Sequence, residues 1–134
     1  MRLFADTFYW VAIALPDDQW AGAVIRLRAS LEEVHLVTTE EVLIEFLTAL
    51  SGKGESNRRL GAGIVRSVLA DAGVTVVHQT HRSFLDGLAL YEKRMDKGYS
   101  MVDCISMNVM RRLRIRQVLT NDRHFAQEGF AVLL

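Results

Sequence analysis

Short apolar runs alternate along this chain with longer segments of helical periodicity, and this alternation limits the possible folds more than any other feature. The runs that we expect to be strands are Leu3–Ala5, His35–Thr38, Val74–Val77, Arg116–Thr120 and, as a possible fifth, Phe130–Leu133. Strands separated by helices favour a parallel sheet with helices on both faces. The sequence therefore predicts an α/β fold with a mostly parallel sheet of about five strands.

The segments between these runs have the periodicity of helices. Pro16 suits a helix start better than a helix interior, and Gly73 and Gly98 are suitable stops. The stretch 51–56, rich in glycine and serine, is the clearest loop. The expected helices are Thr7–Leu15, Asp17–Glu33, one capped by Thr38 or Thr39 that ends near Leu50, Asn57–Asp71, Ser83–Lys97 and Ser100–Arg114.

Length and composition indicate a single domain over residues 1–134, large enough to bury a core. No apolar stretch has the length of a membrane span, and Asp6 comes too early for a secretory signal, so we expect a cytoplasmic protein. The only cysteine, Cys104, excludes an internal disulfide framework and a cysteine-rich zinc site.

Acidic residues stand where two of the expected strands end. Asp6 follows the run 2–5, and Asp122 follows the run 117–121. In parallel α/β sheets, ligands bind beyond the carboxyl ends of the strands, near the point where strand order reverses. Acids from distant segments could therefore meet there, with a divalent cation, a shared proton or basic partners to offset their repulsion. Each of the two could also simply cap the helix that follows it.

Asp103 belongs to a helix in which Ser100 could be the N-cap and Asp103 the third residue of a capping box. At about 100° per residue, Asp103 shares a face with Ser106, Met107 and Met110. An unpaired carboxylate beside this buried stripe would cost several kcal/mol. A metal ion or another compensating group would remove much of that cost.

A second helix offers three glutamates within a few residues, Glu40, Glu41 and Glu45. Glu45 borders the apolar stripe of this helix, whereas Glu41 points further toward solvent. Periodicity favours Glu45 without deciding between them.

Taken in chain order, these acids and their neighbours resemble the PIN-domain nucleases, and most closely their VapC-type toxin branch. The first match is a strand that ends in Asp-Thr before an aromatic helix, and the second is a glutamate in a Val-Leu-x-Glu context. The third acid follows Tyr-Ser-Met-Val, and the fourth lies in a Thr-x-Asp-x-x-Phe element. The four segments in this chain are Phe4–Trp10, Val42–Glu45, Tyr99–Ser106 and Thr120–Phe125.

This resemblance implies a three-layer α/β/α sandwich, PIN-like over the whole chain, and a metal-dependent endoribonuclease that hydrolyses RNA phosphodiester bonds. The toxin branch also implies homodimers and restraint by a small antitoxin protein. Thr120 and Ser106 would donate hydrogen bonds that hold the carboxylates in place. The implied catalytic residues, which would also hold Mg²⁺ or Mn²⁺ or its waters, are Asp6, Glu45, Asp103 and Asp122. Glu45 would be a further ligand or would orient the attacking water.

Basic and acidic residues are equal in number, 16 of each, which argues against a purely electrostatic RNA binder but allows a nuclease whose acidic site cancels a basic rim. Arg123 flanks the expected site and is the candidate for substrate contact, while we expect His124 to be a helix-start residue. The four histidines lack H-x-x-x-H spacing and offer no rival metal site. The aromatic residues 8–10 and Trp20 indicate core or, as we expect, a protein interface.

The sequence leaves two alternatives open. A PIN-like module that binds RNA or protein without cutting can lose acids of the set, and this chain lacks none. A metal-dependent phosphohydrolase or a response-regulator-like phosphoacceptor is also an α/β protein with acids at strand ends. A phosphoacceptor would need a lysine after a late strand, where this chain has Asn121 and Asp122. Phosphatase activity without RNA cleavage would favour the phosphohydrolase.

Overall fold

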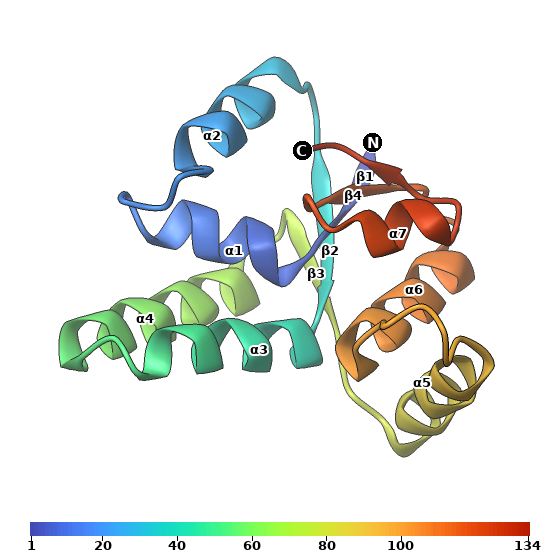
Figure 1. Ribbon diagram of the computed structural model, residues 1–134. Coiled ribbons are helices and arrows are strands. Elements are labelled where there is room, and N and C mark those ends of the chain that lie inside the picture. Colours follow the sequence, from blue (N-terminus) through green and yellow to red (C-terminus); the bar gives the residue numbers. More distant parts are fainter.

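A computed structural model describes residues 1–134 as a five-stranded sheet with helices on both sides (Figure 1). The strand order is β3-β2-β1-β4-β5, and every neighbouring pair is parallel. The predicted α/β/α architecture with a parallel sheet is confirmed. The strands are β1 (Arg2–Ala5), β2 (His35–Thr39), β3 (Val74–Val77), β4 (Gln117–Leu119) and β5 (Ala131–Val132).

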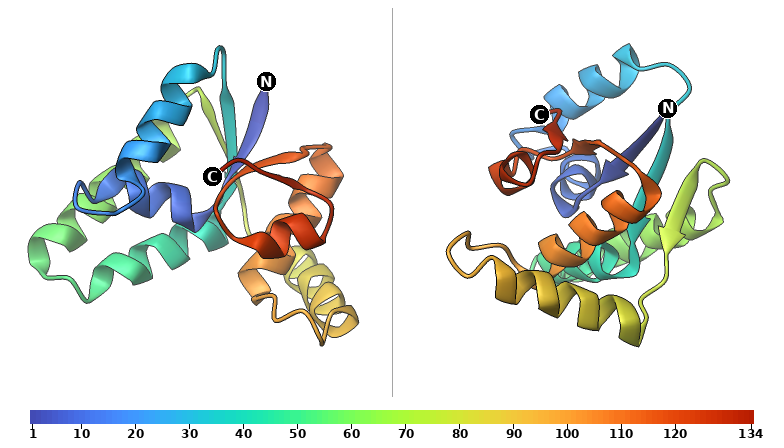
Figure 2. Two further views of the ribbon diagram at one scale, coloured as in Figure 1. Left: turned by 45° about the horizontal axis from the view of Figure 1, so that its top comes forward. Right: turned by 90° about the vertical axis from the view of Figure 1, so that its right-hand side faces the viewer.

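The helices α1, α3 and α4 lie on one side of the strands, and α5, α6 and α7 lie on the other (Figures 1 and 2). No helix of this chain has both the length and the apolar character needed to cross a membrane. The helices are α1 (Thr7–Ala14), α2 (Ala21–Ser30), α3 (Glu40–Ser51), α4 (Glu55–Ala70), α5 (His81–Lys93), α6 (Met101–Leu113) and α7 (Arg123–Gln127).

Two helices differ in extent from the sequence prediction. The helix expected over 17–33 begins only at Ala21, because Oδ1 of Asp18 accepts a hydrogen bond of 2.8 Å from the backbone N–H of Trp20 and holds a turn there; it ends at Ser30. The helix expected over 83–97 begins earlier, at His81, because Thr80 and Ser83 form a capping box. It ends at Lys93, and a turn precedes Gly98, whose φ is +73°.

Strand order reverses at β1, the central strand. The chain runs outward from β1 through β2 to β3, and β4 then pairs with the other edge of β1. Residues Leu3, Phe4 and Ala5 of β1 have no exposed surface, as expected for a strand with neighbours on both edges and helices on both faces. The crevice beyond the carboxyl ends of β1 and β4 is therefore where a parallel sheet of this order places a ligand.

The aromatic residues after β1 belong to the core. Tyr9 and Trp10 are buried, and their rings pack edge to face with centroids 4.9 Å apart. The indole N–H of Trp10 donates to the hydroxyl of Thr38, which in turn donates to the carbonyl of Ala5. The expectation of a protein interface is therefore wrong for Tyr9 and Trp10. Thr39, rather than Thr38, caps α3, because its hydroxyl accepts from the backbone N–H of Val42 at 3.0 Å.

Candidate active site

A polar cavity of about 620 Å³ opens at the carboxyl ends of β1 and β4. Phe8 is the only hydrophobic residue among the twelve that line it. All four acids singled out in the sequence line this cavity, and so do Thr120 and Arg123. They come from segments that are distant along the chain, the end of β1, α3, α6 and the turn before α7.

Asp6 is the most deeply placed acid, with 6% of its surface exposed. Its side chain makes no capping hydrogen bond to α1, so the capping alternative does not account for it. Instead, Oδ2 accepts a hydrogen bond of 3.0 Å from the hydroxyl of Thr120. Burial, followed by the negative charges of Asp103 and Glu45, raises the pKa of Asp6 to about 7.

Asp103 and Asp122 each have two roles, because both cap a helix and both belong to the four acids that line the polar cavity. Oδ2 of Asp103 accepts from the backbone N–H of Ser100 at 3.1 Å in a capping box, and Oδ1 of Asp122 accepts from the backbone N–H of His124 at 2.9 Å. A carboxylate has two oxygens with about four lone-pair sites, so capping leaves capacity for a ligand. Burial, with the charges of Asp122 and Glu45 adding to it, raises the pKa of Asp103.

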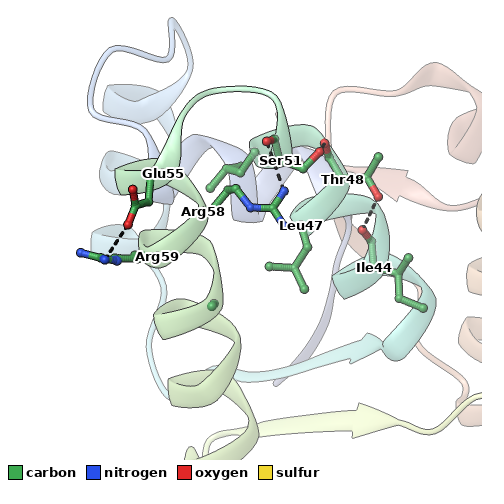
Figure 3. Close-up of a pocket in the computed structure, with 9 residues that line it drawn as sticks. Ile44, Leu47, Thr48, Ser51, Glu55, Arg58 and Arg59 are labelled. Carbon is green, nitrogen blue, oxygen red and sulfur yellow. Dashed lines mark hydrogen bonds and ion pairs between the residues drawn. The ribbon is translucent and has the colours of Figure 1, made fainter.

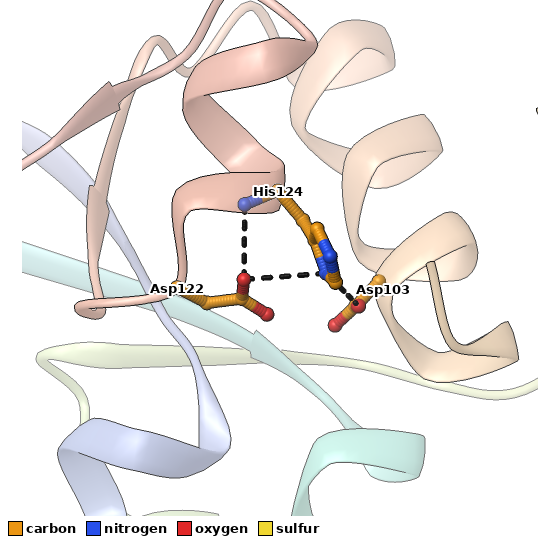
Figure 4. A group of neighbouring side chains, drawn as sticks. All are labelled: Asp103, Asp122 and His124. Atoms are coloured by element: carbon orange, nitrogen blue, oxygen red, sulfur yellow. Dashed lines mark hydrogen bonds and ion pairs between the residues drawn. The ribbon is translucent and has the colours of Figure 1, made fainter. Parts of the chain in front are cut away.

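His124 lies between these two carboxylates (Figure 4). Its Nδ1 is 3.3 Å from Oδ1 of Asp122 and 3.6 Å from Oδ2 of Asp103. The three side chains offer ligand atoms that all lie within 4.8 Å of one another, which makes them the tightest cluster of possible metal ligands. His124 is in the helix start, as expected, but its place between two acids is a feature that histidine spacing along the chain did not indicate.

Glu45, rather than Glu41, points into the polar cavity. The hydroxyl of Thr7 donates a hydrogen bond to Oε1 of Glu45 and thereby ties α3 to the residue after Asp6. Glu41 lines a separate depression formed with residues at the start of α5. The structure thus decides an alternative that helical periodicity left open.

Ser106 has a different position from the one expected of a residue that supports the carboxylates. Its hydroxyl is fully buried on α6 and has no hydrogen-bond partner. No hydrogen bond joins it to an acid of the cavity, so the structure gives the predicted role no support. Thr120 does make the expected contact, and Thr7 makes a comparable one that the sequence pattern did not indicate.

A second pocket, of about 610 Å³, lies between α3 and α4 and has different chemistry (Figure 3). Its lining includes Ile44, Leu47 and Leu50, and its charged residues are exposed on α4, where Arg59 pairs with Glu55. It holds a single carboxylate, that of Glu55. The pocket therefore has the character of a contact surface and not of a reaction centre.

The donor set of the polar cavity fits a divalent cation. Four carboxylates converge on it, and oxygen ligands are those that Mg²⁺ and Mn²⁺ prefer. The raised pKa values of Asp6 and Asp103 show that negative charge is disfavoured there without a counter-charge. A cation held by these oxygens would offset both the cost of burying the charges and the repulsion between them.

Comparison with known proteins places the chain in a family. The PIN domain model matches residues 3–130, and the chain therefore belongs to the PIN-domain family. The 23S rRNA-specific endonuclease VapC20 of Mycobacterium tuberculosis, from strains CDC 1551 / Oshkosh and ATCC 25618 / H37Rv, is 29% identical over 128 residues, which are 96% of this chain and 95% of the relative.

The fold is similar to a solved structure over nearly its full length. The crystal structure of Mycobacterium tuberculosis VapC20, a Sarcin-Ricin loop cleaving toxin, superposes with a TM-score of 0.86 at 27% identity and covers 98% of both chains. The resemblance to VapC-type PIN toxins that the four acidic motifs indicated is thereby confirmed.

Proposed function

We propose that this protein is a metal-dependent endoribonuclease of the VapC toxin type. The observation that carries the proposal is the convergence of Asp6, Glu45, Asp103 and Asp122, from four separate segments, on one polar cavity at the switch point of the sheet. If these acids served only to cap helices, nothing would require all four of them to lie at the same cavity. Membership of the PIN-domain family supports the same function.

Asp6, Asp103 and Asp122 would hold Mg²⁺ or Mn²⁺ directly or through its waters, with Glu45 as a further ligand or as the residue that orients the attacking water. When bound, such an ion supplies an activated water and stabilises charge on the phosphoryl oxygens. His124 contacts two of these carboxylates and offers a further ligand atom beside them.

The other side chains of the cavity would hold these groups and receive the substrate. The hydroxyl of Thr120 fixes Asp6, and that of Thr7 fixes Glu45, so that each carboxylate keeps one orientation. Arg123 is exposed at the rim, where its guanidinium is free to bind a phosphate of the RNA backbone.

Ribosomal RNA is the substrate that we propose to test first. The relatives are named for cleavage of 23S rRNA and of its Sarcin-Ricin loop, and the similarity extends over almost the whole chain. The cut position would be set by contacts along the rim.

A small antitoxin and a second copy of the chain are the proposed protein partners. The apolar pocket between α3 and α4 would accommodate an amphipathic segment of the antitoxin, because Ile44 and its neighbours expose hydrocarbon there (Figure 3). Light scattering of the purified protein would measure whether it is a homodimer.

The test of the proposed nuclease compares wild type with Asp103→Asn on intact ribosomes, 23S rRNA and a Sarcin-Ricin loop oligonucleotide, in Mg²⁺, Mn²⁺ or EDTA. Asn keeps an oxygen that can accept from Ser100, so the helix cap survives while the charge is lost. Asp86→Asn is the matched control, since Asp86 pairs with Arg82 on the exposed face of α5. Metal-dependent cutting by wild type and Asp86→Asn, absent from Asp103→Asn, is the expected result. Equal cutting by all three would refute the assignment of the site.

A further inference from the structure

Glu128 is a buried acid outside the polar cavity. It directly follows α7, and only 5% of its side chain is exposed. A carboxylate at such a position is expected to be paired, because burial without a partner carries a large desolvation cost. Nothing in the sequence pattern distinguished it from the other acids on the surface.

Three side chains from other segments bind this carboxylate. Arg94, just beyond α5, and Arg111, on α6, each form an ion pair with it. The hydroxyl of Tyr99 donates to Oε1 at 3.1 Å. Arg111 also lies over the ring of Phe130, 5.4 Å from its centroid. Glu128 thus joins the end of α7 to α6 and to the segment that leads into it.

The same connection reaches the cavity through Tyr99. The ring of Tyr99 is buried and packs against the imidazole of His124, with centroids 5.2 Å apart and planes inclined by 58°. One residue therefore touches Glu128 with its hydroxyl and His124 with its ring. His124 in turn contacts the carboxylates of Asp103 and Asp122.

Helix α7 needs such a connection because it is short. It has five residues, with Asp122 and His124 at its start and Glu128 at its end. A helix of this length has no stability of its own and takes its orientation from tertiary contacts. Phe125 anchors its inner face in the core, and the ion pairs of Glu128 tie its end to Arg94 and Arg111.

We infer that Glu128 is a positioning residue of the nuclease site, which holds α7 so that His124 and Asp122 face Asp103. This inference rests on the proposed function for its effect on cleavage, but the geometry that it describes can be measured without RNA. A purely structural ion pair would stabilise the fold without influencing the cavity.

Glu128→Gln is the variant that tests this role, and Asp86→Asn is its matched control. Asp86 also pairs with an arginine, Arg82, but on the exposed face of α5 and outside the polar cavity. Tyr99→Phe is the second variant, because it removes only the hydroxyl that reaches Glu128 and leaves the ring against His124. Each protein is compared with wild type at a temperature well below its unfolding midpoint.

Three quantities are measured on each protein. They are kcat and KM for RNA cleavage, the affinity for Mn²⁺ by calorimetry, and the imidazole signals of His124 by NMR in metal-free protein. Glu128→Gln is expected to lower kcat about tenfold with little change of KM, to weaken Mn²⁺ binding, and to shift the His124 signals. Tyr99→Phe is expected to change these three quantities in the same direction by less, and Asp86→Asn is expected to leave them unchanged.

A lower unfolding temperature with wild-type kcat, Mn²⁺ affinity and His124 signals would overturn the inference and leave Glu128 as a structural residue only. If Glu128→Gln does not fold, the same three measurements on Tyr99→Phe test the inference. If wild type cuts no RNA, the proposed function has failed, and the His124 signals with the Mn²⁺ affinities still decide whether Glu128 positions the cavity.

Discussion

The hydroxyl of Thr120 donates a hydrogen bond of 3.0 Å to Oδ2 of Asp6, although 114 positions separate the two residues in the sequence. The same hydroxyl accepts from the backbone N–H of Asp122 at 3.2 Å. Thr120 is fully buried between the ends of β1 and β4, so one side chain sets the relative positions of two acids of the cavity.

Thr120→Val should therefore damage the cavity as well as the fold. Valine has nearly the same shape but neither donates to Asp6 nor accepts from Asp122, so we expect a loss of about 1–3 kcal/mol in the free energy of unfolding. Cleavage should fall about 10–100-fold. Urea unfolding and RNA cleavage measure the two effects.

Thr38→Val is the matched control for this substitution. Thr38 is equally buried and also bridges two partners, Trp10 and Ala5, but it does not line the cavity. Thr38→Val should lower the free energy of unfolding by a similar amount and leave the rate of RNA cleavage unchanged. Equal loss of cleavage in both variants would mean that Thr120 acts only through stability.

Asp6→Asn should stabilise the metal-free protein at neutral and higher pH. The pKa of Asp6 is raised from 3.8 to about 7 in the folded protein, chiefly by burial. Between these pH values the folded state retains a proton that the unfolded state has released, so the free energy of unfolding falls as pH rises from about 4 to 7. Asn carries no charge at any pH, so the Asp6→Asn variant avoids this fall in the free energy of unfolding. At about 1.36 kcal/mol per pKa unit, the fall amounts to up to about 4 kcal/mol.

Urea unfolding in EDTA at pH 4 and pH 8 measures this effect, with Asp17→Asn as the control on an exposed loop. The stabilisation by Asp6→Asn should be present at pH 8 and absent at pH 4. Cleavage by this variant should be lost, because its gain in stability comes from removing a charge that the reaction needs. A stability difference that is the same at both pH values would contradict the argument.

Divalent cations should stabilise the folded protein. An ion that binds only the folded state at about 100 times its Kd adds about 2.7 kcal/mol to the free energy of unfolding. Thermal unfolding with Mn²⁺, and again after addition of EDTA, measures the effect. Asp103→Asn should lose most of it and Asp86→Asn none, whereas a wild type that gains nothing from Mg²⁺ or Mn²⁺ would count against the metal site.

Glu45→Gln should reduce kcat about 100-fold or more if the carboxylate orients water or binds the ion. Gln keeps an oxygen that can accept from Thr7, so the contact between α1 and α3 should persist. Glu41→Gln, one turn earlier on the same helix but outside the cavity, should leave kcat unchanged. Loss of activity in both variants to the same extent would contradict the assignment of Glu45.

Much of this architecture was predictable from local pattern. The strands were found because β-branched and apolar runs are short and are bounded by helix starts and glycines. Asp6 and Asp122 were placed at one edge of the sheet by topology alone, since parallel strands end on the same side. The capping box of Ser100 and Asp103 was also predictable, because it involves residues only three positions apart.

Features that depend on contacts between distant segments were not predictable. The choice between Glu45 and Glu41 depends on where Thr7 lies, and periodicity carries no information on that partner. Tyr9 and Trp10 are core residues because the helix that carries them, α1, packs against α3 and α4, although their sequence pattern is equally typical of an interface. Ser106 points into a buried space without a partner, which only the packing of α6 determines.

By itself, the sequence determined the order of strands and helices along the chain, the parallel sheet and the positions of Asp6 and Asp122 at its carboxyl edge, because these follow from residue periodicity and from chain connectivity. The tertiary structure alone decided which acids face one another, that His124 lies between Asp103 and Asp122, and that Glu128 connects α7 to α6. The physical reason is that charge, burial and hydrogen bonding at a site depend on distances between atoms that meet only after the chain has folded.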